Sequence, residues 1–182
     1  DAAQNNAFRA INRAWRSGGR ILFEDERYGL SEVAPDELAG WVDELALQAE
    51  RGASGGVEVA APRIGLYRPW TASMDEGWTR WLLERYEFAF ENLYNQRIID
   101  GNLRERYDVI LLADIAPRAI LQGHAVGSIP ARYAGGIGVP GTRALAQFVR
   151  DGGTLVCVNG STRFAIEQLG VPVDDGLGGL RR

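Results

Sequence analysis

The run Tyr107–Ala113, with the sequence YDVILLA, constrains the fold most because it is continuously apolar after its first two residues. Such a run is typical of a strand that is buried on both faces. Strands of this kind occur in parallel sheets, since helices cover both faces of those sheets. The run therefore predicts a sheet inside a layered α/β domain.

Segments on either side of this run alternate between strand-like and helix-like patterns. Further strands are predicted at residues 20–24, 63–67, 88–93 and 154–158, and helices at residues 8–15, 35–49, 73–86, 142–150 and 162–169. Right-handed crossovers would join these strands into a mainly parallel sheet. The predicted fold class is α/β, a three-layer α/β/α sandwich.

The 182 residues suit a single domain. The best candidate for an internal boundary is the glycine-rich loop 51–56. It would separate an N-terminal helix–strand–helix part, residues 1–56, from a main part, residues 57–173, which a tail at residues 174–182 follows. We expect the chain to be a fragment of a longer protein, because both of its ends are abrupt.

Composition argues against several classes of function. The net charge of −4 disfavours nucleic acid as a partner. All 20 basic residues are arginine, so no lysine is present to form a Schiff base or to bind phosphate. No apolar run reaches the roughly 18 residues that a membrane-spanning helix needs. The single cysteine excludes an intramolecular disulfide.

A metal site within this chain is not expected. His124 and Cys157 are the only histidine and the only cysteine. Catalytic zinc usually has three protein ligands, mostly histidine, so a zinc site would need both residues and a carboxylate. We predict no metal and no other cofactor in the chain.

Cys157 lies in the stretch TLVCVNGST, where a predicted strand meets a turn and a helix. A nucleophile often stands at such a junction in α/β enzymes, and His124 is the available base. Against this role, Val156 and Val158 flank the cysteine, whereas the tight turn around a nucleophile requires small neighbours. Cysteine is also among the residues most often buried. A structural role for Cys157 is favoured, and a catalytic role with His124 stays open.

Ligands bind to α/β sheets at the carboxyl ends of the parallel strands. Asp114 ends the buried strand, and Asn159 and Ser161 follow the next strand in the chain. These three residues are the predicted ligand-binding site, beside the long loop 114–140. Other roles stay open, since Asp114 could cap the segment after it and Ser161 with Thr162 could cap the next helix.

The predicted helix 73–86 begins with a capping box of the form S-x-x-E. Its acidic pair, Asp75 and Glu76, is therefore assigned to the first helical turn rather than to acid–base chemistry. Three tryptophans in or near this helix are predicted to pack in the core rather than to line a ligand groove: Trp70, Trp78 and Trp81.

Four longer stretches carry a resemblance to a known family. They are PRIGLYRPWTASMDEGWTRWLLERYEF, YDVILLAD, YAGGIGVPGTRALAQFVRDGGTLV and FAIEQLGVPV, which fall within residues 60–173. They resemble the C-terminal region of bacterial proteins of the zinc carboxypeptidase (carboxypeptidase A-like) family. That region looks like a class I glutamine amidotransferase-like domain, which implies a flavodoxin-like topology.

The resemblance implies a zinc peptidase domain upstream of this chain, and a secreted or periplasmic location. The zinc motif of that family, His-x-x-Glu with a distant histidine, has no counterpart here, because Ala-Val-Gly follows His124. Amidotransferases place a cysteine nucleophile at a turn after a strand, usually followed by a small residue and glycine. Alignment on Gly160 puts Val158 at that position and Cys157 one residue earlier, on the opposite face of the strand.

We therefore expect a non-catalytic accessory domain of a zinc metallocarboxypeptidase. It would pack on, stabilise or present substrate to the upstream peptidase domain of the same polypeptide. Two alternatives stay open. One is a cysteine-dependent hydrolase or amidotransferase that uses Cys157, and the other is a module that binds a small molecule near Asp114 and Asn159.

Overall fold

The computed structural model describes residues 3–52 and 55–176. Contacts between residues divide it into two compact units, each described by itself. The first unit comprises Asp1–Pro62 and Leu82–Ala89, and the second comprises Arg63–Trp81 and Phe90–Arg182. The first unit is thus assembled from two segments that are distant in the sequence.

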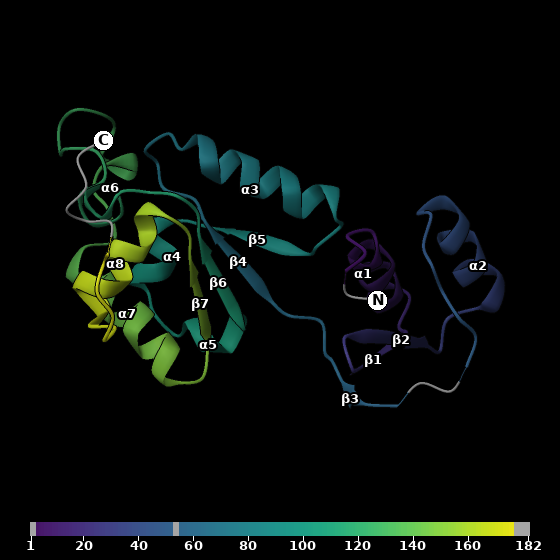
Figure 1. Cartoon of the computed structure of the whole chain (residues 1–182). Coiled ribbons are helices and arrows are strands. Elements are labelled where there is room, and N and C mark those ends of the chain that lie inside the picture. The colour runs from purple at the N-terminus through teal and green to yellow at the C-terminus, as the bar shows by residue number, and fades with distance from the viewer. Residues whose placement is uncertain (1–2, 53–54, 177–182) are drawn as a thin grey trace. The chain divides into compact units, whose positions relative to one another are not determined.

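A four-stranded parallel sheet forms the centre of the second unit (Figure 1). Its strands, in the order in which they lie side by side, are β5 (Phe90–Leu93), β4 (Ile64–Tyr67), β6 (Val109–Leu112) and β7 (Thr154–Cys157). The sequence predicts all four strands, and the structure confirms them with ends that differ by no more than two residues. The predicted parallel sheet is therefore correct for this unit.

Helices join the strands and follow the last one. They are α3 (Met74–Arg85), α4 (Asn95–Ile99), α5 (Leu103–Arg106), α6 (Pro117–Gln122), α7 (Gly138–Arg150) and α8 (Gly160–Leu169), with a 3-10 helix at Ala131–Tyr133. The sequence predicts α3, α7 and α8. It misses α4, α5 and α6 because a helix of four to six residues is too short to show a helical period.

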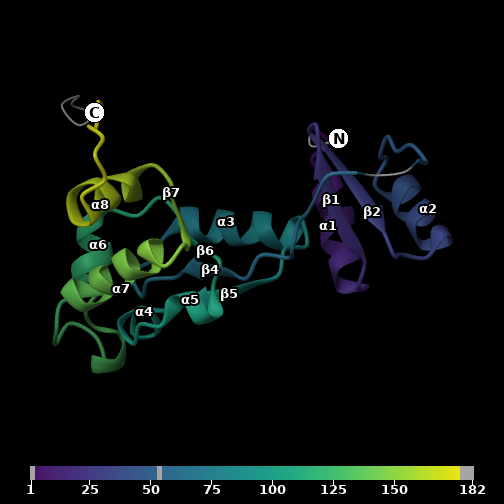
Figure 2. The ribbon, with the colours of Figure 1, turned by 90° about the horizontal axis from the view of Figure 1, so that it is seen from below.

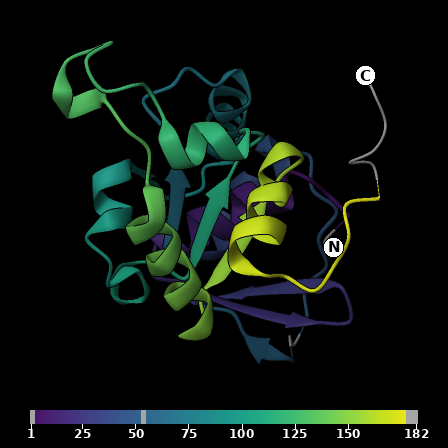
Figure 3. The same cartoon turned by 90° about the vertical axis from the view of Figure 1, so that its left-hand side faces the viewer.

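Helices lie on both sides of the parallel sheet. α4, α5 and α7 share one side, and α8 lies on the other (Figure 2, Figure 3). The part of α3 that belongs to this unit, residues 74–81, runs along the side away from α7 (Figure 1). The second unit is therefore an α/β fold that is compatible with a three-layer sandwich.

The core of the second unit lies mainly on one face of the sheet. Ile110 and Leu112 of β6 are fully buried there, with Phe148 of α7 among their cluster. The alternate residues of β6, Val109 and Leu111, are only half-buried. The prediction that this strand is buried on both faces is thus correct for one face and only partly correct for the other.

The exposed face of α3 corrects one prediction. Trp78 is 61% exposed and Trp81 is 52% exposed, and Met74, one helical turn before Trp78, is 74% exposed. Trp78 and Trp81 therefore do not pack in the core. Trp70 is 38% exposed and stacks on Tyr94 instead of entering the core. Helical spacing identifies a face of a helix, but it does not show whether other residues of the chain cover that face.

The first unit contains a three-stranded antiparallel sheet, in the order β2 (Arg27–Ser31), β1 (Arg20–Glu24), β3 (Val57–Glu58). Its helices are α1 (Ala7–Arg16) and α2 (Pro35–Glu44). The prediction includes both helices and β1 but neither β2 nor β3. The mainly parallel arrangement predicted for the chain does not extend to this unit.

A cluster of charges ties the two segments of the first unit together. Glu87 follows α3 and accepts hydrogen bonds from three arginines of α1: Arg9, Arg13 and Arg16. Arg13 Nη2 lies 2.8 Å from Glu87 Oε1, and Arg13 Nη1 lies 2.6 Å from Glu44 Oε2. These guanidinium groups, Arg13 above all, lower the pKa of the Glu87 carboxyl to about 2.

We predict that Glu87→Gln lowers the free energy of unfolding at pH 7 by about 2 kcal/mol, the usual value for hydrogen bonds to a charged group. The folded pKa of Glu87 is about 2, below its usual value of 4.5. Its contribution is therefore complete above about pH 5 and is lost as the pH falls toward 2. Urea unfolding at pH 7 and at pH 3 measures both values.

The matched control for this prediction is Glu84→Gln, since Glu84 is an exposed residue of the same segment. It should leave the free energy of unfolding within about 0.5 kcal/mol of the wild type. An equal loss for Glu87→Gln at pH 7 and pH 3 would contradict the electrostatic explanation.

Candidate functional site

The predicted ligand-binding residues meet where β7 turns into α8. Asp114 lies just beyond β6, the neighbour of β7. Its Oδ1 accepts the backbone N–H of Gly160 at 2.9 Å, and its Oδ2 accepts the side-chain amide of Asn159. The structure therefore brings Asp114 and Asn159 together, as the sequence predicts.

Asn159 stands at the apex of the turn in a strained backbone conformation. Its φ of 48° and ψ of −114° are rare for a residue with a side chain. A strained residue between a strand and a helix is the arrangement that presents the nucleophile in many α/β enzymes. The apex is Asn159 rather than Val158, the residue that alignment on Gly160 places there. An amide at this apex is not a nucleophile for acyl transfer.

Gly160 allows the close approach of the Asp114 carboxylate. A Cβ on Gly160 would lie 2.6 Å from Asp114 Oδ1, so any other residue here would displace the carboxylate. The carboxylate takes up the first free N–H of α8, at the end of the helix where an anion is favoured. The chain itself thus supplies the negative charge that this helix terminus attracts.

Ser161 fastens the same turn to β6. Its side chain is fully buried, and its Oγ lies 2.9 Å from Leu112 O, to which it can donate. The same Oγ accepts the backbone N–H of Val158 at 2.8 Å. These bonds give Ser161 a structural role in the turn. The predicted helix start is two residues late, because α8 begins at Gly160 and Ser161 and Thr162 already lie inside it.

Cys157, the last residue of β7, is half-buried and packs against the main core. Burial raises the pKa of its thiol, and a hydrogen bond with Ser161 offsets only part of that rise. Reactive cysteines have a lowered pKa, since the thiolate is the nucleophile. The environment of Cys157 is therefore that of a structural cysteine.

His124, the predicted partner of Cys157, braces a different segment. Its Nε2 lies 3.2 Å from the carbonyl oxygen of Trp70, in the loop that follows β4. The long loop around His124 is not irregular throughout, because it contains α6 and a 3-10 helix. Its residue Gly135 accepts a hydrogen bond from the side chain of Asn95 at 3.0 Å. Both contacts give this loop a bracing role at the carboxyl edge of the sheet.

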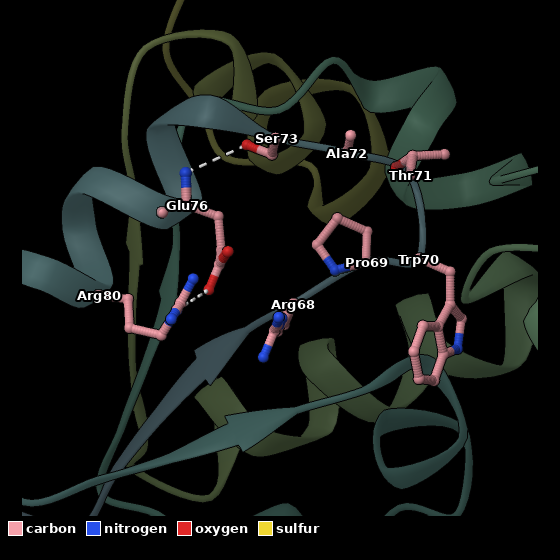
Figure 4. A pocket seen from close by; sticks show the side chains of 9 residues that line it. Arg68, Pro69, Trp70, Thr71, Ala72, Ser73, Glu76 and Arg80 are labelled. Atoms are coloured by element: carbon pink, nitrogen blue, oxygen red, sulfur yellow. Dashed lines mark hydrogen bonds and ion pairs between the residues drawn. The ribbon is translucent and has the colours of Figure 1, made fainter.

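A pocket of about 310 Å³ lies at the carboxyl end of β4 (Figure 4). We call it the β4–α3 pocket. Its lining comes from the loop after β4 and from the first turns of α3, and it includes Arg68, Trp70, Ser73, Glu76 and Arg80. The sequence patterns did not predict this pocket. The available signal was an arginine directly after a buried strand, followed by a capping box, but those residues were assigned only to the helix.

One of the two hydrogen bonds of the predicted capping box is confirmed, the one between the Glu76 backbone and the Ser73 side chain. Ser73 Oγ accepts the backbone N–H of Glu76 at 3.1 Å. The Glu76 side chain is buried and bonds to Arg80 Nε at 3.2 Å. Glu76 therefore has an ion-pair partner in the pocket wall, one helical turn further along α3.

The described residues bring no three histidine, cysteine, aspartate or glutamate side chains together in a way that could hold a metal ion. Over the same residues, none of the helices is long and apolar enough to cross a membrane.

We predict that Asp114→Ala destabilises the protein by about 1.5 kcal/mol, because Gly160 N–H and the Asn159 amide both lose their acceptor. Asp114→Asn keeps one oxygen for Gly160 N–H and should lose less. Chemical unfolding of both variants measures the difference. Wild-type stability for Asp114→Ala would show that the carboxylate does not hold the turn.

We also predict that iodoacetamide labels Cys157 in the folded protein at least tenfold more slowly at pH 8 than in urea. The raised pKa and the half-buried position both reduce access to the thiolate. Mass spectrometry of the alkylated chain against time measures the rate. Rapid labelling at pH 6 would contradict a structural role and revive the cysteine-dependent hydrolase.

Comparison of the chain with protein-family models, with curated proteins and with solved structures found no match.

Proposed function

We propose that this chain is a non-catalytic accessory domain that packs on the peptidase domain of a zinc carboxypeptidase-like protein. The observation that carries the proposal is the aromatic face of α3, formed by Met74, Trp78 and Trp81. Its partner would be the upstream peptidase domain that the sequence resemblance implies. A secreted or periplasmic location belongs to the same proposal.

The aromatic face of α3 has the character of a contact surface. Trp78 and Trp81 stand edge to face with ring centroids 5.9 Å apart, and both are more than half exposed. Met74 extends the face by one turn toward the start of the helix. Large exposed apolar patches mark interaction sites, and tryptophan is enriched among the residues that dominate binding energy. A second protein surface would remove these rings from water.

The β7–α8 turn supports a domain without catalysis. Asn159 occupies the apex where a nucleophile would stand, and Asp114 fills the space at the start of α8. The strand order β5-β4-β6-β7 is the order expected for the first four strands of a flavodoxin-like sheet. A flavodoxin-like, amidotransferase-like fold that lacks its nucleophile is consistent with both features.

Zinc would belong to the upstream domain in this proposal. The described part of the chain offers no cluster of three ligands, and the whole chain has one histidine. The alternative of a cysteine-dependent hydrolase is disfavoured by the raised pKa of Cys157 and by the contact of His124 with Trp70.

The gene provides the first test. We expect the reading frame upstream of Asp1 to encode His-x-x-Glu and a further histidine. A reading frame without these residues would remove the peptidase domain from the proposal.

The second test is a binding measurement. We predict that Trp78→Ala with Trp81→Ala weakens association with the separately expressed peptidase domain by at least about 30-fold, as expected when central tryptophans of an interface are lost. Isothermal titration calorimetry measures the affinity. The matched control is Val139→Ala, which changes an exposed apolar residue of α7 and should leave the affinity unchanged. Unchanged affinity for the double variant would refute docking through α3.

A further inference from the structure

The β4–α3 pocket lies where an α/β sheet favours a ligand. β4 comes first of the four strands in the chain, yet it lies between β5 and β6. The chain therefore winds to one side of β4 to form β5 and to the other side to form β6. Ligands of open α/β sheets bind at the carboxyl ends of the strands beside such a reversal. The β4–α3 pocket lies at the carboxyl end of one of these strands, and its lining residues all fall within 68–80.

The pocket carries a net positive charge. Arg68 and Arg80 contribute two cations, and Glu76 contributes one anion that is paired with Arg80. Arg68 contacts Tyr94, with its Nη1 3.4 Å from the phenolic oxygen and its guanidinium carbon 6.0 Å from the ring centroid. Neither contact supplies a negative charge, and none of the carboxylates in residues 3–52 and 55–176 forms an ion pair with Arg68. A ligand with one negative charge would balance the pocket.

The positions of the side chains favour an anion in this space. Arg68 is part of the pocket wall, with Pro69 on one side of it in the view and the Glu76–Arg80 pair on the other (Figure 4). The first turn of α3 adds the positive end of its dipole, although Asp75, an exposed acid of that turn outside the lining, opposes it in part. The Ser73 hydroxyl accepts a bond from Glu76 N–H and keeps its own hydrogen for donation.

The volume of the pocket and its remaining lining residues limit the size of the ligand. A volume of about 310 Å³ is at the lower end for small-molecule sites. Trp70 borders the pocket, and its ring is held by stacking on Tyr94 at 4.5 Å and by an edge contact with Tyr133 at 4.6 Å. In Figure 4 this indole points away from Arg68, on the other side of Pro69, so the ligand contact near Arg68 is mainly polar.

We propose that the β4–α3 pocket binds a small monocarboxylate, with the guanidinium of Arg68 as the main contact of the carboxylate group. Guanidinium groups bind carboxylates through two parallel hydrogen bonds, which makes Arg68 the specificity-determining residue. Arg80 stays paired with Glu76 and adds to the positive field. The lining of this site does not include Met74, Trp78 or Trp81, so the ligand proposal can be tested independently of docking through α3.

The test is a titration of the protein with benzoate, followed by the backbone amide resonances. We expect benzoate to shift the resonances of residues 70–77, and Arg68→Gln to weaken its binding at least tenfold. Benzamide, which has the same shape without the charge, should bind at least tenfold more weakly than benzoate. The matched control is Arg143→Gln, since Arg143 is an exposed arginine of α7 outside the pocket. Its affinity for benzoate should equal that of the wild type.

Three results would overturn the proposal: equal binding of benzoate and benzamide, unchanged benzoate affinity in Arg68→Gln, or tighter binding of inorganic phosphate than of benzoate. If Arg68→Gln fails to fold, Arg68→Lys replaces it, because lysine keeps the charge and loses the planar pair of donors. Arg68→Lys should weaken benzoate at least threefold, and full affinity in this variant would overturn the role of the guanidinium.

Discussion

The hydrogen bonding of β4 to a strand on each side is the constraint on which the second unit depends. All four residues of β4 are buried, and Gly65 leaves so little space that a Cβ would lie 3.2 Å from the Tyr107 ring. A strand in this position cannot move without disturbing β5 and β6 together. It also fixes where the loop after it emerges. The β4–α3 pocket and the braces from His124 and Asn95 all depend on that fixed edge.

Two helices, α3 and α8, begin at this edge of the sheet, and the charged groups at their first turns differ. α8 receives the carboxylate of Asp114, which takes the place that an anionic ligand would have. At α3, Glu76 forms an ion pair with Arg80, and no carboxylate among the described residues pairs with Arg68. The first terminus is closed by the protein's own groups, whereas the second has an uncompensated cation. The same electrostatic preference thus explains one structural contact and one proposed binding site.

Sequence patterns reveal features that depend on neighbours in the chain. The apolar runs of β4, β6 and β7 and the period of α7 are local, so the strands and the helix are predictable. β2 depends on pairing such as Phe23 with Tyr28, and no local pattern specifies that partner. The Asn-Gly pair shows that a turn follows β7, but only the fold determines that Asn159 holds the strained apex. Whether Trp78 is buried or exposed is equally non-local, because it depends on whether other residues cover that face of α3.

The cluster around Glu87 has a consequence for the order in which the chain acquires structure. The three arginines of α1 are synthesised before their shared acid, Glu87, which comes more than 70 positions later in the chain. The first unit therefore cannot reach its final set of contacts until β4 and α3 have been synthesised. During that interval the arginines of α1 lack the carboxylate of Glu87, and Phe8 lacks its ring contact with Phe88.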